Sequence, residues 1–245
     1  MIALIDADIV VYKATASLDT PDEMIEPGLY RFDYPVALMN AKEFCKSIVE
    51  QTGADDAILC FTSTFNYRKE IIPTYKGNRV SRKPIMYSAV KEEIQKWARF
   101  RSLTKIGLEA DDVLGILHTG PLAGESVICT IDKDLRTVPG LHFNWDKEFN
   151  GVEEVSEEEA DRAFYEQIIT GDHTDGYSGA VGWGPKKAKE LLDQTERSDW
   201  WETIVNKPYK GDFDAAIETA RVARILRADE FDTESRSPIL WEPPA

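Results

Sequence analysis

The amino-acid sequence predicts an α/β protein built on a parallel sheet, with helices on both faces of the sheet. Short apolar runs typical of buried strands occur at 2–5, 57–61 and 127–131. Amphipathic stretches with helical spacing lie between them, at 36–51, 90–100 and 110–118. Because strands alternate with helices along the chain, neighbouring strands are expected to run parallel.

The remaining segments complete this arrangement. Residues 103–106 and 141–144 are expected to add short strands, and the acidic segment 19–35, interrupted by Pro and Gly, a surface excursion. Ser156 and Glu159 form a capping box, which predicts a helix that runs to about Thr170. We therefore expect an α/β core over residues 1–155 and a helical, turn-rich lobe over residues 156–245.

The composition fits one core with an appended lobe. The chain has 245 residues, of which 42% are hydrophobic, and no apolar run approaches the ~20 residues of a membrane helix. Its first residues carry two aspartates and no basic region, so they predict a strand and not a signal peptide. Cys45, Cys60 and Cys129 lie far apart in apolar surroundings, which is typical of buried free thiols in a reducing cytoplasm.

The charge is unevenly distributed. A net charge of −15 argues against a nucleic-acid partner, but residues 68–83 hold six basic side chains and one acidic one, whereas residues 146–166 hold nine acidic ones. A basic run of this kind is often only a solvated face. Here Tyr67, Tyr75 and Tyr87 flank it and could stack on bases, which favours a nucleic-acid contact. Pro73, Gly77 and Pro84 suggest a mobile arch or a partial helix.

Acidic side chains recur where expected strands and helices end or begin. They fall in four groups: Asp6 and Asp8; Glu109, Asp111 and Asp112; Asp132 and Asp134; Asp172 and Asp175. One such aspartate is most simply a turn former or a helix cap. The carboxyl ends of parallel strands share one edge of a sheet, so four groups would converge there. Their mutual repulsion requires cations, and hard oxygen ligands suit Mg²⁺ or Mn²⁺.

A phosphatase of the haloacid-dehalogenase type is a competing interpretation of the same acids. LIDAD followed by IVV fits the start of such enzymes, and GDHTD loosely resembles their late acidic motif. That motif needs to follow a strand, with three residues between its acids. Here two residues intervene, the preceding segment reads as a helix, and Glu109, Asp111 and Asp112 stay unexplained.

Five motifs in order resemble the flap-endonuclease or 5′-nuclease superfamily, and most closely its phage 5′-to-3′ exonucleases of the T-odd podovirus type. They are LIDAD, RKEIIPTYKGNR, IGLEADDVLG, TIDKDL and GDHTDGYSGAVGWGPKKAKELL, spread over residues 1 to about 195. Residues 196–245 contribute nothing to the resemblance.

The resemblance implies a PIN-like nuclease core, a basic arch over residues 66–90 and a helix–hairpin–helix element over residues 171–194. It implies a metal-dependent 5′-to-3′ exonuclease on duplex DNA, with flap endonuclease and RNase H activity, acting in a host cytoplasm if phage-encoded. Its substrates would be duplex 5′ ends, flaps or RNA–DNA hybrids, and its cofactors two Mg²⁺ or Mn²⁺ ions.

Residue by residue, the resemblance assigns the following roles. Lys76 and Arg79 would act on the scissile phosphate. The metal-binding acids would be Asp6, Glu109, Asp111, Asp112, Asp132, Asp134, Asp172 and Asp175. Because Mg²⁺ keeps part of its hydration shell, we expect Asp112 and Asp175 to act through metal-bound waters. DNA would be held by Tyr75, Gly182, Gly184, Lys186 and Lys187, with a monovalent cation such as K⁺ at the hairpin.

One departure affects the expected site. The family usually has an aspartate soon after the second strand, where this chain has Thr62 and Ser63. The first metal site would then bind its ion more weakly. Alternatively, the chain would be a structure-specific DNA-binding protein without catalytic activity.

Overall fold

A computed structural model describes residues 1–21, 30–79 and 82–244. Its centre is a six-stranded sheet in the order β5-β4-β1-β6-β7-β8. Five strands run parallel: β1 (Ile2–Asp6), β4 (Asp56–Phe61), β5 (Arg101–Thr104), β6 (Ser126–Cys129) and β7 (Gly140–Phe143). The sixth, β8 (Val152–Val155), pairs antiparallel to β7 at the edge. The predicted parallel sheet is confirmed, and β8 is an addition to it.

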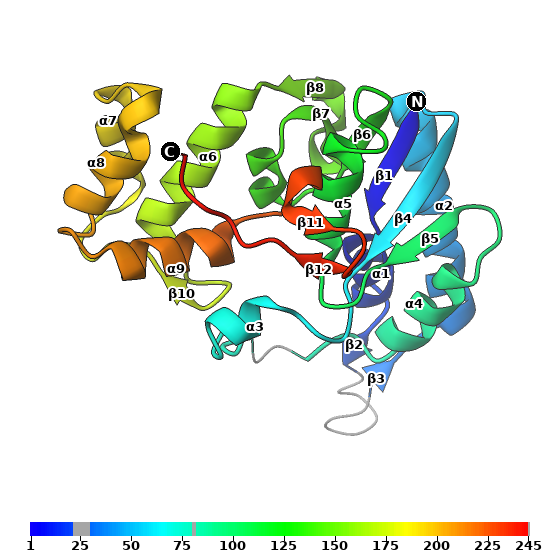
Figure 1. Cartoon of the computed structure of the whole chain (residues 1–245). Coiled ribbons are helices and arrows are strands. Elements are labelled where there is room, and N and C mark those ends of the chain that lie inside the picture. Colours follow the sequence, from blue (N-terminus) through cyan, green and yellow to red (C-terminus); the bar gives the residue numbers. More distant parts are fainter. Residues whose placement is uncertain (22–29, 80–81, 245) are drawn as a thin grey trace.

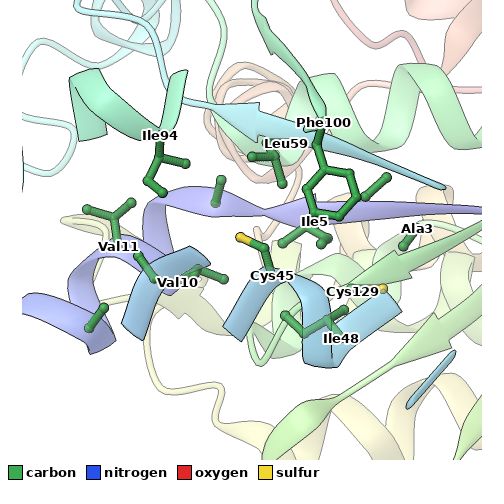
Figure 2. Packing of buried hydrophobic residues seen from close by; sticks show 14 of the residues in the cluster. Ala3, Ile5, Val10, Val11, Cys45, Ile48, Leu59, Ile94, Phe100 and Cys129 are labelled. Atoms are coloured by element: carbon green, nitrogen blue, oxygen red, sulfur yellow. The ribbon is translucent and has the colours of Figure 1, made fainter. Parts of the chain in front are cut away.

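Alternate residues of β1 face two different cores, which makes the molecule a three-layer structure. Ala3 and Ile5 pack against α1 (Ala7–Ala16), α2 (Tyr34–Thr52) and α4 (Tyr87–Gln95), as Figure 2 shows. Leu4 faces the opposite core, formed with α5 (Ala110–Thr119). Such alternation follows from the two-residue period of a strand. The three cysteines are buried and free, as expected.

The helices that follow β8 form a lobe beside the sheet (Figure 1). Its helices are α6 (Glu157–Thr170), α7 (Pro185–Asp193), α8 (Trp200–Asn206) and α9 (Phe213–Ala223). Around a core of their own they bury aromatic and aliphatic side chains such as Phe164, Trp200 and Ile217. The Ser156–Glu159 capping box at the start of α6 is present as predicted.

After α9 the chain returns to the sheet core, and its final segment then packs against the helical lobe. Ile225, Leu226 and Phe231, the last in the short strand β11 (Phe231–Asp232), pack in the same core as Leu4. β11 pairs with β12 (Ser237–Pro238), and Trp241 then contacts Phe164 of α6, with ring centroids 5.2 Å apart. The expected division at residues 155 and 156 therefore stays a prediction, because the tail contributes to both cores.

The segment expected as an arch contains little regular structure in its described part. It holds one helical turn, α3 (Arg68–Ile71), then a series of turns up to α4. Residues 80 and 81 lie outside the described residues, as does the 22–29 part of the expected surface excursion. A two-stranded hairpin, β2 (Thr20–Pro21) with β3 (Tyr30–Arg31), frames that excursion. Within the described chain, no helix is both long and apolar enough to cross a membrane.

Candidate active site

The carboxyl edge of the parallel strands gathers the predicted acids. Asp6 ends β1, Glu109 caps α5 beside β4 and β5, and Asp132 follows β6 at the start of a 3-10 helix, η1 (Lys133–Thr137). Asp172 and Asp175 reach the same edge from the lobe, in the hairpin formed by β9 (Gly171–Asp172) and β10 (Tyr177–Ser178).

Asp6, Asp111 and Asp132 lie close enough to repel one another. Burial, the Asp8 carboxylate and Asp132 raise the pKa of Asp6 to about 7, although Thr130 donates a hydrogen bond to it at 3.1 Å. Burial and the charges of Asp6, Asp132 and Glu109 raise the pKa of Asp111 well above its ordinary value. These are side chains that a cation would stabilise in their charged form.

A second group centres on Asp134. Burial and the neighbouring Asp132 raise the pKa of Asp134 to about 6, with Asp172 and Asp175 contributing and Lys133 opposing. The Lys133 ammonium lies 3.8 Å from both Asp134 and Asp172. The structure thus brings together seven of the eight predicted metal-binding acids, in two adjoining groups.

Lys76, which belongs to the basic segment, contacts two of these acids. Its ammonium donates to Glu109 and lies 3.4 Å from Asp175, and the Arg79 guanidinium also donates to Asp175. Burial disfavours the charge of Lys76, but Glu109, Asp111 and Asp175 raise its pKa above the ordinary value. Burial likewise opposes the charge of Glu109, whose pKa is nevertheless lowered by Arg68 and Lys76.

The backbone of Lys76 adopts an uncommon conformation, with φ at +54°. Contacts with the β9–β10 hairpin hold it there: the Lys76 amide donates to the Asp175 carbonyl at 2.7 Å, and the Asn78 side chain donates to the His173 carbonyl at 2.5 Å. These contacts fix the direction of the Lys76 side chain towards the acids.

Tyr75 does not have the role expected of it. Its side chain is 3% exposed and its hydroxyl donates to Glu109 at 2.9 Å and to Asp175 at 3.1 Å. Tyr67 and Tyr87 are buried as well. Stacking of these tyrosines on bases was therefore a wrong prediction, because the hydrophobic cores take up their rings. Tyr75 instead links Glu109 of the sheet core to Asp175 of the helical lobe through its hydroxyl group.

Asp112 also departs from its expected role. It is fully buried, and Arg68 donates to its two oxygens at 2.7 and 2.8 Å. The backbone amides of Glu109 and Leu226 donate to the same oxygens. Such a carboxylate has no free face for a metal-bound water, so we assign Asp112 to the scaffold and correct the prediction.

Asp8 lies beside the position after β4 where the expected aspartate is absent, and it is paired with Lys91. The Thr62 amide donates to Asp8 at 2.6 Å, and Tyr87 and Lys91 donate to the other oxygen of Asp8. The Thr62 hydroxyl accepts from the Ala110 amide at the start of α5. Sequence reasoning noticed Asp8 but gave it no role, since its contacts with residues 62 to 91 depend on the folded chain.

The predicted hairpin of the lobe presents its backbone and lysines to solvent. Gly182 has φ at +79°, and Gly184 caps α7, whose first residue is Pro185 as expected. The Lys186 side chain is 91% exposed, and Lys187 donates to the Gly182 carbonyl at 2.8 Å. The hairpin thus offers cations and an open helix start to an anionic partner.

Among the residues that the structure describes, no three His, Cys, Asp or Glu side chains form a ready-made metal site. The acids at the sheet edge form ion pairs with basic side chains, namely Lys76, Arg79 and Lys133. The late acid pair also lies in a hairpin after a helix, outside the parallel sheet, which removes the basis of the phosphatase interpretation.

A parallel sheet with acids at its carboxyl edge and a helical lobe beside it defines the PIN-like nuclease fold. Residues 1–165 match the family model described as the 5′-3′ exonuclease, N-terminal resolvase-like domain. The chain belongs to this 5′-3′ exonuclease family, as its motifs led us to expect.

Relatives extend the similarity beyond the domain. The exonuclease of Escherichia phage T7 and the exodeoxyribonuclease of Enterobacteria phage T3 are each 29% identical, over 99% of this chain and 93% of their own. The sequence similarity therefore extends over residues 196–245, a segment in which the motifs showed no resemblance to the family. A flap endonuclease of bacteriophage T5, solved with DNA and metal ions, superposes with a TM-score of 0.60 at 16% identity, over 91% of this chain and 88% of its own.

Proposed function

We propose that the protein is a divalent-metal-dependent 5′-to-3′ exonuclease that hydrolyses phosphodiester bonds at the 5′ ends of duplex DNA, with flap endonuclease and RNase H activity. The names of its phage relatives support the exonuclease part of this proposal, and the flap endonuclease of the same fold supports the flap part. Phage relatives also suggest that it works in the cytoplasm of a host cell.

The observation that carries the proposal is the repulsion among buried acids at the sheet edge, with Lys76 directed onto them. Three of these acids have pKa values raised by burial and by one another. All of the donors are carboxylate oxygens, which fit Mg²⁺ or Mn²⁺ better than a softer metal.

Two groups of acids would hold two ions. Asp6, Glu109 and Asp111 would hold the first, and Asp132, Asp134 and Asp172 the second, with Asp175 acting through water. When bound, such ions supply an activated water and neutralise charge on the leaving oxygen.

The residues of the chain itself would act on the phosphate by charge and position. Lys76 would place its ammonium against the phosphate as negative charge develops there, the kind of preorganised electrostatic contact that lowers barriers most. Arg79 would add a second cation from the same turn. Tyr75 would fix Glu109 and Asp175 by its two hydrogen bonds.

The helix–hairpin–helix would hold the duplex without reading its sequence. Lys186 and Lys187 would contact phosphates, and the backbone around Gly182 and Gly184 would approach one closely. A monovalent cation such as K⁺ at the hairpin would mediate part of this contact.

A cleavage assay tests the proposal. Wild type is mixed with 5′-labelled duplex, flap and RNA–DNA substrates in Mg²⁺, with excess chelator as the blank, and the products are sized. Asp132→Asn is expected to abolish cleavage while leaving DNA binding in Ca²⁺ intact. Cleavage by the variant at a near wild-type rate would contradict the metal assignment, and binding without cleavage by wild type would favour the non-catalytic alternative.

A further inference from the structure

A cavity of about 340 Å³ lies beside the acids, between the ends of β6 and β7 and the start of β8. Its walls include Thr130, Asp132, Lys133, Arg136, Lys147 and Glu153. This volume is at the lower end of the range for small-ligand pockets, roughly 300 to 1,000 Å³. It is enough for one nucleotide unit and too small for a length of strand.

Both lysines in the wall, Lys133 and Lys147, are available to an anion. Of the acids there, Asp146 is bound by Lys13 at 2.7 Å and Glu153 by Arg136 at 3.3 Å. Lys147 is exposed and makes no ion pair within residues 1–21, 30–79 and 82–244. The Lys133 side chain is 82% exposed, and its ammonium lies 3.8 Å from the nearest carboxylate oxygens of Asp134 and Asp172, which makes both ion pairs long.

The cavity and the acids share a wall. Thr130, which lines the cavity and is 5% exposed, donates to Asp6 at 3.1 Å and accepts from the Asp132 amide at 3.0 Å. Asp132 itself belongs to both. A molecule in the cavity would therefore lie directly against the proposed site of hydrolysis.

Resting on the nuclease function proposed above, we propose that this cavity binds the 5′-terminal nucleotide of the strand that is cut. Lys147 and Lys133 hold its 5′-phosphate, and its 3′ side points towards Asp132. One nucleotide then lies between the strand end and the bond that breaks, so the products are mononucleotides.

The chemistry of hydrolysis makes this arrangement self-repeating. The oxygen of water bonds to phosphorus, the bond from phosphorus to the 3′ oxygen breaks, and that oxygen takes a proton. The cavity is left with a nucleoside 5′-monophosphate that has a free 3′-hydroxyl. The shortened strand carries a new 5′-phosphate, which is the group that the cavity binds, so each cut prepares the next.

Equilibrium binding of deoxyadenosine 5′-monophosphate, followed by calorimetry in chelator, tests the cavity without any cleavage. We expect the monophosphate to bind at least about tenfold more tightly than deoxyadenosine, the factor that one charge-assisted contact supplies. Lys147→Ala should reduce this difference, because Lys133 alone then contacts the phosphate, whereas Lys207→Ala, an exposed lysine of the lobe, should leave it unchanged. Equal affinities for monophosphate and nucleoside in wild type would overturn the proposal.

The same variants are then compared on duplexes with a 5′-phosphate or a 5′-hydroxyl. Wild type should have the lower KM on the phosphorylated end and release mononucleotides, and in Lys147→Ala the difference in KM between the two ends should be smaller. Cleavage without end discrimination by wild type, or products with a 3′-phosphate, would refute the cavity assignment and leave the nuclease function standing. No cleavage of any substrate would instead refute the nuclease function.

Discussion

At the scale of single residues, Asp111 and Asp112 show how adjacent acids acquire opposite roles. Asp111 is surrounded by like charges, whereas Asp112 is neutralised by Arg68. Helix geometry separates the two, because neighbouring residues on a helix point about 100° apart. The sequence EADD predicted acids at the sheet edge but could not tell which of them would be neutralised by a basic side chain, since Arg68 lies 44 residues from Asp112 along the chain.

The two acids should respond with opposite signs to loss of their charge. Without metal, Asp111→Asn is expected to stabilise the fold because it removes repulsion from Asp6 and Asp132. Asp112→Asn should destabilise it by roughly 3–5 kcal/mol, because Arg68 is then buried without its partner. Urea unfolding in chelator measures both. A stabilising effect of Asp112→Asn would return that residue to the metal-binding group.

Lys76 should matter to turnover far more than to binding. Lys76→Ala is expected to lower the rate of cleavage ~100-fold or more, by analogy with the loss of a preorganised donor. Single-turnover kinetics and DNA affinity in Ca²⁺ separate the two effects, and Lys76→Arg, which keeps the charge, should recover part of the rate. If Lys76→Ala weakened binding and turnover equally, the residue would be one more DNA contact of the basic segment.

At the scale of elements, local signals predicted the five parallel strands and most of the core helices, and missed one helix and one strand of the core. The capping box at Ser156 and the acids before α5 define those helix starts, and both helices appear where expected. α1 was missed because its apolar run continues directly from β1. β8 was missed because Glu153 and Glu154 make it polar, which only an edge strand with exposed side chains allows.

The hairpin before α7 should account for part of the salt dependence of DNA binding. Each lost phosphate contact lowers the slope of log affinity against log salt by ~0.9. Lys186→Ala with Lys187→Ala is therefore expected to flatten the slope by about 1 to 2, with Lys207→Ala as the control. A slope that stays the same in the double variant would place the duplex anchor elsewhere.

At the scale of the whole molecule, two buried histidines connect stability to pH. His118 and His142 face each other with ring centroids 6.0 Å apart, and burial lowers the pKa of each to about 4. The unfolded chain, with histidine pKa values near ~6.5, therefore binds more protons between pH 4 and 6.5. Their contribution is fully present above pH ~6.5 and is lost as the pH falls towards 4.

A comparison of wild type with His118→Asn/His142→Gln isolates this effect. The free energy of unfolding of wild type should decline relative to the variant from pH 6.5 to 4, by up to about 1.4 kcal/mol per pH unit for each histidine. The raised pKa values of Asp6 and Asp134 act in the opposite sense but are common to both proteins. Parallel pH profiles would show that the two histidines have the same pKa in the folded and the unfolded chain.

The fold class and most of the acidic groups could be predicted because they depend on short-range patterns. The burial of Tyr75 and the pairing of Arg68 could not, because each depends on segments that meet only in the folded chain. Tyr75 lies 100 residues from Asp175, which its hydroxyl contacts. Such contacts leave no periodicity in the sequence.

The contacts of Arg68 also determine when the site can form during synthesis of the chain. Its guanidinium donates to the carbonyls of Val222 and Arg224, and the Leu226 amide reaches Asp112. Every acid and the lysine of the proposed site lie before residue 176, yet their support arrives 154 residues after Arg68. As the ribosome makes the chain from its N-terminus, the reactive groups emerge well before the segment that fixes them. A nascent chain should therefore be unable to cleave nucleic acid until the segment around residues 222–226 has left the ribosome.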